Sequence, residues 1–328
     1  MIRSLFWKPG QAVESIEGIA DFDTLFAEPE AVLWIDMVNP TDQESFILTH
    51  DFHFHPLAIE DVIEEEDAIS ELSRSKIDDY KNYIYAEFSL AESITRDEGI
   101  KLQEVHLFLT KNTVVTVRDE NHRIFNYLHG RALRDDRLMS RGAEFLFHNL
   151  LDVMVDNYSS ILEYFEREVD EIEKDVLDEP DEKTVKKIFT LRRDIYDLKR
   201  IVLPQREMLR QISRGQFPMI SDRASLYFRD IHDHLTRIIE LSESHRDTLI
   251  SALDVYFSNV STKTNQIIKI LTIFTVILMP PTFLVGLWGM NFKYMPELQW
   301  KYGYLVFWGI IAVITLIMVF FFKKKKWI

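Results

Sequence analysis

The stretch NQIIKILTIFTVILMPPTFLVGLWGMN, residues 265–291, decides how this chain is organised. Within it, Ile267–Trp288 has 22 residues and a single charge, Lys269. A helix of that length crosses a bilayer core of about 30 Å. A second stretch, Tyr304–Phe322, has 19 residues and no charge. Because only 15 residues separate the two stretches, they predict a membrane hairpin with both chain ends on one side.

Lysines near the ends of the two spans predict the orientation of this hairpin. Lys263, Lys269 and the run 323–326 flank the ends away from the connecting loop, whereas the loop holds Lys293 and Lys301. Positively charged flanks favour the cytoplasmic side of a membrane, so six lysines against two predict that both termini are cytoplasmic. We expect an integral protein of the cell (inner) membrane.

The chain before the spans is strongly acidic. Residues 263–328 hold one acid and eight lysines, which leaves 52 acids and 30 bases in residues 1–262, a net charge of −22. Such a domain repels nucleic acid and concentrates cations, so divalent cations are expected partners and nucleic acid is not. A merely solvated acidic surface has the same composition. The sequence contains no cysteine, which excludes disulfides and thiolate metal sites.

Residues 1–142 predict a cytoplasmic α/β domain. Ala31–Val38 has the composition of a buried strand, and Thr41 with Glu44 three residues later has the pattern of a helix capping box. The pair Lys111-Asn112 lies between two runs rich in β-branched and aromatic residues, which favours a hairpin at that point.

Helical periodicity begins after residue 142. Residues 143–220 predict two long antiparallel acidic helices joined near Pro180. Residues 221–290 contain no proline or glycine before Pro280, which predicts one stalk helix continuing into the first span at about 267–288. At 1.5 Å per residue it is about 100 Å long, too long for one globular domain.

The remaining segments are an outer loop at 289–303, a second span at 304–322 and a basic cytoplasmic tail at 323–328. The predicted fold class is therefore α+β. It combines a cytoplasmic α/β domain with a long helical stalk and two C-terminal transmembrane helices.

Apart from Ile268, one face of the first span is polar, small or flexible. Steps of three and four residues connect its members, as on one face of a helix in a bundle: Asn265, Ile268, Thr272, Thr275, Met279, Thr282, Gly286 and Gly289. Polar side chains inside a membrane tend to face a bundle interior or a water path, which favours a pore wall with apolar constrictions at Met279 and Ile268. Small residues and threonines also let helices pack closely, and the spacing alone leaves both interpretations open.

A short motif follows this face. Gly289-Met290-Asn291 ends the span, MPEL occupies 295–298 in the loop, and the chain finishes with KKKKWI at 323–328. This combination resembles the signature of the CorA magnesium-transporter family. HPLAIED at 55–61 and YFRD at 227–230 also resemble segments of that family, so the resemblance covers nearly the whole chain.

The resemblance implies a funnel-shaped homopentamer in a lipid bilayer, in which the first span of each subunit lines a central pore. It implies a selectivity filter at Gly289, Met290 and Asn291 that receives hydrated Mg²⁺, with Glu297 retained in the outer loop. Pore-lining positions are implied for Asn265, Ile268, Leu271, Met279 and Thr282, and the polar face adds Thr272, Thr275 and Gly286.

The resemblance also implies a regulatory metal site. Asp61 and Asp230 match carboxylates that hold Mg²⁺ between neighbouring subunits, so Mg²⁺ is expected both as the transported ion and as a regulator that closes its own path. The implied function is a Mg²⁺ channel, with Co²⁺ and Ni²⁺ as further candidate ions.

The sequence departs from the family pattern in three places. Lys293 stands where an acid often follows the tripeptide, which weakens the attraction of cations to the mouth. The stretch 64–74 resembles an acidic insertion after Asp61, and its weak periodicity predicts a loop or a helix end. Pro281 follows Pro280 and adds a second break in the pore helix.

Three alternatives remain. A zinc transporter of the same superfamily is one, but zinc-transporting relatives tend to lack the tripeptide. His53 and His55 form a pair that could bind a softer metal, although a surface or half-buried histidine pair gives the same pattern. A membrane-anchored enzyme is another, yet the sequence has no P-loop, G-x-S-x-G, H-E-x-x-H or G-x-G-x-x-G motif, so no enzyme is expected. The third is a membrane-anchored scaffold, against which the polar face and the tripeptide argue.

Overall fold

The computed structural model describes residues 1–17, 28, 30–63, 75–95, 99–178 and 181–327. The chain divides into two compact units. Met1–Val176 with Asp181–Ala252 form the first, and Leu177–Pro180 with Leu253–Ile328 form the second. The acidic stretch 64–74, for which the sequence predicts a loop or a helix end, lies outside the described residues.

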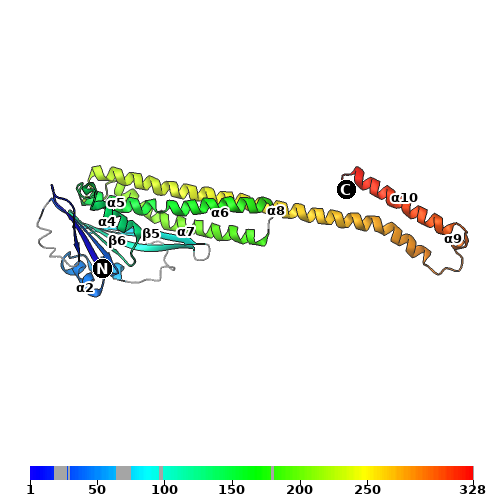
Figure 1. Ribbon diagram of the computed structural model, residues 1–328, viewed down its shortest axis with the longest axis horizontal. Helices are drawn as coiled ribbons and strands as arrows, with labels where there is room; N and C mark the ends of the chain where they lie inside the picture. The colour runs from blue at the N-terminus through cyan, green and yellow to red at the C-terminus, as the bar shows by residue number, and fades with distance from the viewer. Residues whose placement is uncertain (18–27, 29, 64–74, 96–98, 179–180, 328) are drawn as a thin grey trace. The chain divides into compact units, whose positions relative to one another are not determined.

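The first unit contains a β-sheet (Figure 1). It has seven strands, in the order β2-β1-β3-β7-β6-β5-β4. The strands are β1 (Ile2–Trp7), β2 (Glu14–Glu17), β3 (Val32–Val38), β4 (Lys76–Asp79), β5 (Ile84–Thr95), β6 (Gly99–Leu109) and β7 (Thr113–Arg118). β3 and β7 pair in parallel, and the other described pairs are antiparallel. The run TVVTVR of β7 is buried throughout, as suits β-branched residues in a central strand covered on both faces.

Two predicted local structures of this sheet are confirmed. The strand predicted at Ala31–Val38 is β3, which ends where Asn39 takes a left-handed conformation with φ of 41°. The Lys111-Asn112 pair lies in the turn of the β6–β7 hairpin. The Thr110 amide closes that turn by donating to the Thr113 carbonyl over 2.8 Å.

A buried ion pair connects the two parallel strands. The Arg118 guanidinium donates to the Asp36 carboxylate from Nε over 3.1 Å and from Nη2 over 2.7 Å, and neither side chain is exposed. Burial acts to raise the pKa of Asp36, but the His129 imidazole, 3.4 Å away at Nε2, and the charge of Arg118 outweigh it and lower the pKa to about 2. The carboxylate is therefore charged inside the fold.

Helices cover both faces of the sheet (Figure 1). On one face, α2 (Asp42–His50) and α3 (Pro56–Ile63) contribute apolar side chains such as Leu48 and Ile59 to the core. On the other, α5 (Ala143–Asp156) and α7 (Glu182–Ser213) lie against β5, β6 and their neighbours. α4 (Arg123–Ala132) and the 3-10 helix η1 (Asp136–Leu138) connect β7 to α5. The predicted capping box at Thr41 and Glu44 is confirmed at the start of α2.

The structure has three helices where the sequence predicts two between residues 143 and 213. α5 ends at Asp156, and α6 (Ser159–Asp178) begins after a turn at Asn157 and Tyr158. Tertiary hydrogen bonds hold this turn, because the Tyr158 hydroxyl donates to the Ser89 carbonyl over 2.6 Å and the Asn157 amide donates to the Ala91 carbonyl. These partners are distant in sequence, so helical periodicity does not reveal the break.

The single long helix predicted after Pro218 is confirmed as α8 (Asp222–Trp288), which has 67 residues and continues through Pro280 and Pro281. α9 (Pro296–Gln299) and α10 (Gly303–Lys324) follow it. α8 and α10 are each long and apolar enough to cross a membrane.

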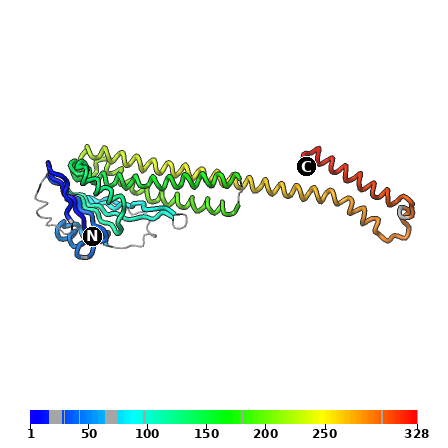
Figure 2. Tube along the Cα trace, in the orientation of Figure 1, coloured from blue at the N-terminus to red at the C-terminus, as the bar shows by residue number. Residues whose placement is uncertain are grey.

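In the second unit, α10 runs back along the apolar part of α8 (Figure 2), and side chains near both ends of this stretch join the two helices. The rings of Trp288 and Phe307 meet at 5.2 Å. At the opposite end, Lys269 Nζ donates to the Lys326 carbonyl over 3.1 Å, and Ile273 and Phe322 are both buried. The side of α8 that carries Ile273 and Trp288 therefore faces α10.

Candidate ion pathway and metal sites

The polar face predicted in the first span lies on the side of α8 turned away from α10. Its members follow one another by three or four residues, and on a helix they stand roughly opposite Ile273 and Trp288. Met279 is 70% exposed and Ile268 is 54% exposed, whereas Ile273 is 8% exposed. The polar face is thus free to meet water or another copy of the chain, while the apolar face is used by α10.

Three threonines on this face share one arrangement. The hydroxyl of Thr272 donates to the Ile268 carbonyl over 2.8 Å, that of Thr275 donates to Leu271 over 2.9 Å, and that of Thr282 donates to Leu278 over 2.8 Å. Each hydroxyl proton is committed to the helix, so the oxygen offers lone pairs outward. Water molecules around a cation point their protons outward, and such oxygens are suited to accept them.

A hollow interrupts the same face near Pro280 and Pro281. Thr275, Leu278, Met279, Thr282 and Phe283 line it, and its volume is about 420 Å³. Two threonine oxygens and the flexible thioether of Met279 therefore border one space on the exposed side of the span. The second proline remains inside the helix rather than ending it.

The tripeptide Gly289-Met290-Asn291 follows α8 directly. The Gly289 amide donates to the Val285 carbonyl over 2.9 Å, and a Cβ at Gly289 would lie 3.2 Å from that oxygen, so a larger residue would crowd the helix end. Asn291 and Lys293 are exposed in the loop that follows. Glu297 lies in α9, and its side chain is outside what the structure describes.

The two predicted regulatory carboxylates have different surroundings. Asp61 lies on α3, and its Oδ2 accepts a hydrogen bond from Lys76 Nζ over 2.7 Å. Asp230 is exposed on α8, and its charge contributes to raising the pKa of Asp152 on α5. The two carboxylates therefore belong to different helices, α3 and α8, and have different neighbours within one chain.

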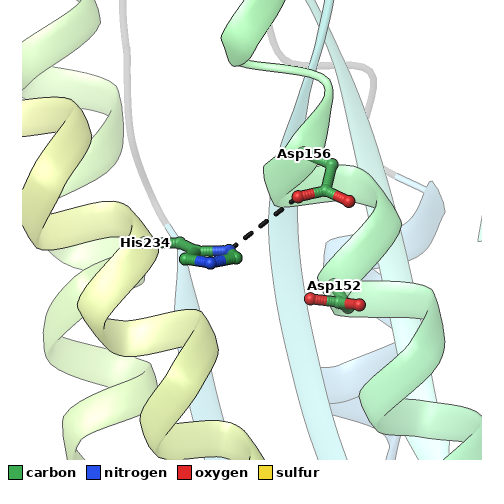
Figure 3. Close-up of side chains that lie close together, drawn as sticks. All are labelled: Asp152, Asp156 and His234. Carbon is green, nitrogen blue, oxygen red and sulfur yellow. Dashed lines mark ion pairs between the residues drawn. The ribbon is translucent and has the colours of Figure 1, made fainter.

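Three side chains that the sequence did not single out form a cluster beside Asp230 (Figure 3). Asp152 and Asp156 project from α5 toward His234 on α8, and one ligand atom from each lies within 4.8 Å of the others. His234 Nδ1 is 3.8 Å from Asp156 Oδ1. Burial, followed by the charges of Asp156 and Asp230, raises the pKa of Asp152 to about 6.

This cluster has the donor set of a divalent-cation site. Carboxylate oxygens suit Mg²⁺, and an imidazole nitrogen suits Co²⁺, Ni²⁺ or Zn²⁺. A cation would also relieve the repulsion between carboxylates that raises the pKa of Asp152. The signal in the sequence is a pair of i, i+4 spacings, Asp152 with Asp156 and Asp230 with His234, which place each pair on one side of its helix.

Comparisons with known proteins agree on one family. The model of the family described as CorA-like Mg²⁺ transporter protein matches residues 29–324. The cobalt/magnesium transport protein CorA of Thermotoga maritima is 35% identical, over 96% of this chain and 90% of that protein.

Two solved structures show the same fold. The complete structure of the CorA magnesium transporter from Methanocaldococcus jannaschii has a TM-score of 0.84 at 22% identity, covering 100% of this chain and 99% of that one. The cytoplasmic domain of ZntB from Vibrio parahaemolyticus has a TM-score of 0.62 at 14% identity, covering 80% of this chain and 99% of that one.

Proposed function

The chain belongs to the CorA-like Mg²⁺ transporter family, and on this premise we propose that it is a membrane channel for divalent cations, Mg²⁺ first and Co²⁺ and Ni²⁺ as further substrates. The relative from Thermotoga maritima is named for both cobalt and magnesium transport. The observation that carries the proposal is the exposed face of α8, where three threonine oxygens lead toward Asn291.

The channel is formed by several copies around an axis, and we take the family's homopentamer as the arrangement. One α8 per subunit then turns its polar face inward and leaves its apolar faces to α10 and to lipid. Asn265, Thr272, Thr275 and Thr282 supply oxygen to a hydrated ion along this wall. Side chains of the remaining wall positions narrow or widen the path: Ile268, Leu271, Met279 and Gly286.

The ring of Asn291 side chains is the proposed filter, with Gly289 and Met290 shaping the end of the helix. Mg²⁺ gives up its waters reluctantly, so a ring of neutral amides that hydrogen-bonds to the hydration shell selects it without stripping it. A ring of carboxylates would bind the ion more tightly and release it more slowly. Because Lys293 stands beside this ring, electrostatic attraction at the mouth is weaker than an acid there would give.

Regulation is proposed at the acidic first unit. Asp61 of one subunit and Asp230 of its neighbour hold Mg²⁺ between them, and their repulsion loosens the ring when the ion leaves. The cluster of Asp152, Asp156 and His234 adds ligands next to Asp230, within the same subunit. The lysine bias of the sequence supports a cytoplasmic first unit with both termini on the same side. We take the inner membrane as the location of the two spans.

A zinc transporter of the same superfamily is less well supported. The likeness to the cytoplasmic domain of ZntB is at 14% identity and concerns the fold alone. A membrane-anchored scaffold explains neither the threonine oxygens nor the tripeptide at the end of the span.

Ion flux into proteoliposomes tests the function. Purified wild-type protein is expected to admit Mg²⁺, and Asn291→Ala is expected to lose selectivity for Mg²⁺ over Ca²⁺ or to lose flux. Gln299→Ala, which removes another exposed amide from the same loop, is the matched control and is expected to behave as wild type. Absence of Mg²⁺ flux in both wild type and Asn291→Ala, with the protein still a folded oligomer, would favour the scaffold. Zinc flux without magnesium flux would favour the zinc transporter.

A further inference from the structure

The carboxylate of Asp61 is already occupied by a cation from its own chain. Lys76, the first residue of β4, places Nζ 2.7 Å from Asp61 Oδ2. The side chains are 37% and 29% exposed, so the pair is partly shielded from water. Asp230, the other carboxylate of the proposed regulatory site, has no ion pair among the residues that the structure describes. The two carboxylates of that site therefore differ before a metal binds, because only Asp61 is paired with a cation of its own chain.

The ammonium of Lys76 is held from a second direction. Its Nζ lies 5.6 Å from the ring centroid of Tyr85, within the range of a cation–π contact. Tyr85 is fully buried, and its hydroxyl is hydrogen-bonded to His106 Nδ1 at 2.9 Å. Burial lowers the pKa of His106 to about 4, so this imidazole is neutral near pH 7 and does not repel the ammonium.

Lys76 is charged in this position. Burial acts to lower its pKa, but the hydrogen bond and the charge of Asp61 outweigh burial, and the carboxylates of Glu87 and Asp78 add to the effect, so the pKa is raised above its ordinary value. A divalent ion coordinated by the same carboxylate would meet this ammonium at close range. Both cations cannot occupy that position without strong repulsion.

We propose that Lys76 is an internal competitor for the divalent cation at Asp61. Its ammonium neutralises Asp61 in the ion-free subunit, and the arriving ion must displace it before the carboxylate can act as a ligand. Lys76 thereby sets the cation concentration at which the regulatory site fills. The Tyr85 ring and the nearby carboxylates of β4 and β5 give the released ammonium a place to remain. This inference rests on the proposed regulatory role of Asp61 and Asp230.

Two substitutions of Lys76 move the competition in opposite directions. Lys76→Met keeps the aliphatic stem against Tyr85 and removes the charge, so the Mg²⁺ concentration at half-saturation is expected to fall about threefold to tenfold. Lys76→Arg offers Asp61 a planar pair of donors, which binds a carboxylate more firmly, so the half-saturating concentration is expected to rise. The readout is the Mg²⁺-dependent rise in melting temperature of the purified full-length protein, together with inhibition of flux by internal Mg²⁺.

Lys101→Met is the matched control. Lys101 belongs to the same unit and pairs with Glu92 at 2.7 Å, so the substitution removes the same charge from an ion pair that lies away from Asp61 in the sheet. Its half-saturating Mg²⁺ concentration is expected to stay within about twofold of wild type, because scattered surface charges act weakly in salt. An equal shift in Lys101→Met and Lys76→Met would show a general charge effect and overturn the proposal.

Asp61→Asn separates failure of this inference from failure of the regulatory site. If Asp61→Asn leaves Mg²⁺ binding unchanged, the proposed site itself fails. If Asp61→Asn weakens binding while Lys76→Met and Lys76→Arg both match wild type, the site stands and the competition does not exist. In the Asp61→Asn background, Lys76→Met is expected to have no further effect.

Discussion

His234 on α8 lies 3.8 Å, Nδ1 to Oδ1, from Asp156 on α5. This contact joins the helix that continues into the membrane to a helix that covers the sheet. Phe228, two turns earlier on α8, is fully buried and packs against Phe147 and His148 of α5. The binding of an ion between these two helices would therefore depend on how α8 packs against α5 and the sheet.

The imidazole should decide which metal this cluster prefers. His234→Gln removes the one nitrogen ligand, so affinity for Co²⁺ is expected to fall by at least about tenfold, while affinity for Mg²⁺, which prefers oxygen, changes little. Co²⁺ absorption spectra and Mg²⁺ titrations of the full-length protein measure the two affinities. Equal losses for both metals would contradict a role of His234 in metal preference. His245→Gln, a histidine substitution elsewhere on α8, is the control.

The pKa of Asp152 predicts how pH affects this cluster. The carboxyl titrates near pH 6 in the fold instead of near its ordinary value of 3.8, because burial and neighbouring carboxylates disfavour its charge. The stability that its protonated form contributes is fully present below pH 3.8 and is lost as pH rises through 6. Since a metal needs the deprotonated carboxylate, stabilisation by Co²⁺ should grow between about pH 5 and 7.

Melting temperatures with and without Co²⁺ across this pH range measure the effect. In Asp152→Asn, the metal-free stability should lose the part of its pH dependence near 6 that comes from Asp152, while the part that comes from Asp194, whose pKa is also raised to about 6, remains. A Co²⁺ effect that grows in the same way in wild type and Asp152→Asn would show that another group is responsible.

Asp36 and Arg118 should be essential for the first unit. Asp36→Asn leaves a buried guanidinium without its counter-ion, and removing one member of a buried pair costs about 3–5 kcal/mol. Asp135→Asn, which breaks the exposed pair with Arg137, should change stability far less. Because the pKa of Asp36 is lowered to about 2, its contribution is present above its unfolded value of 3.8 and is lost as pH falls toward 2. Urea unfolding at several pH values measures the stability lost in each variant and the pH dependence of the Asp36 contribution.

Local patterns were enough to predict much of the fold. Apolar length predicted the two membrane helices, and the absence of proline and glycine after Pro218 predicted the continuity of α8. The Lys111-Asn112 turn predicted the β6–β7 hairpin. The turn at Asn157 and Tyr158 escaped prediction because it depends on carbonyls of β5 that are far away in sequence.

The candidate sites also differ in whether local sequence patterns could predict them. The polar face of α8 was predictable because helical spacing alone puts its members together. The cluster of Asp152, Asp156 and His234 was not, because it exists only where α5 packs against α8. Nor did any local signal reveal that Lys76 reaches Asp61, since the two residues lie in different elements.

The proposed channel requires that the polar face of α8 border a water-filled path. The chain has no cysteine, so single cysteines can be introduced without background. Met279→Cys lies on the exposed face, and Ile277→Cys, on the side of α8 toward α10, is the matched control.

A membrane-impermeant, water-soluble thiol reagent applied to the channel in proteoliposomes provides the most direct measurement. The proposal predicts rapid modification of Met279→Cys with block of Mg²⁺ flux, and slow modification of Ile277→Cys with flux retained. Slow modification of Met279→Cys by this reagent, together with rapid modification by a lipid-soluble one, would place the polar face against lipid and contradict the proposed channel.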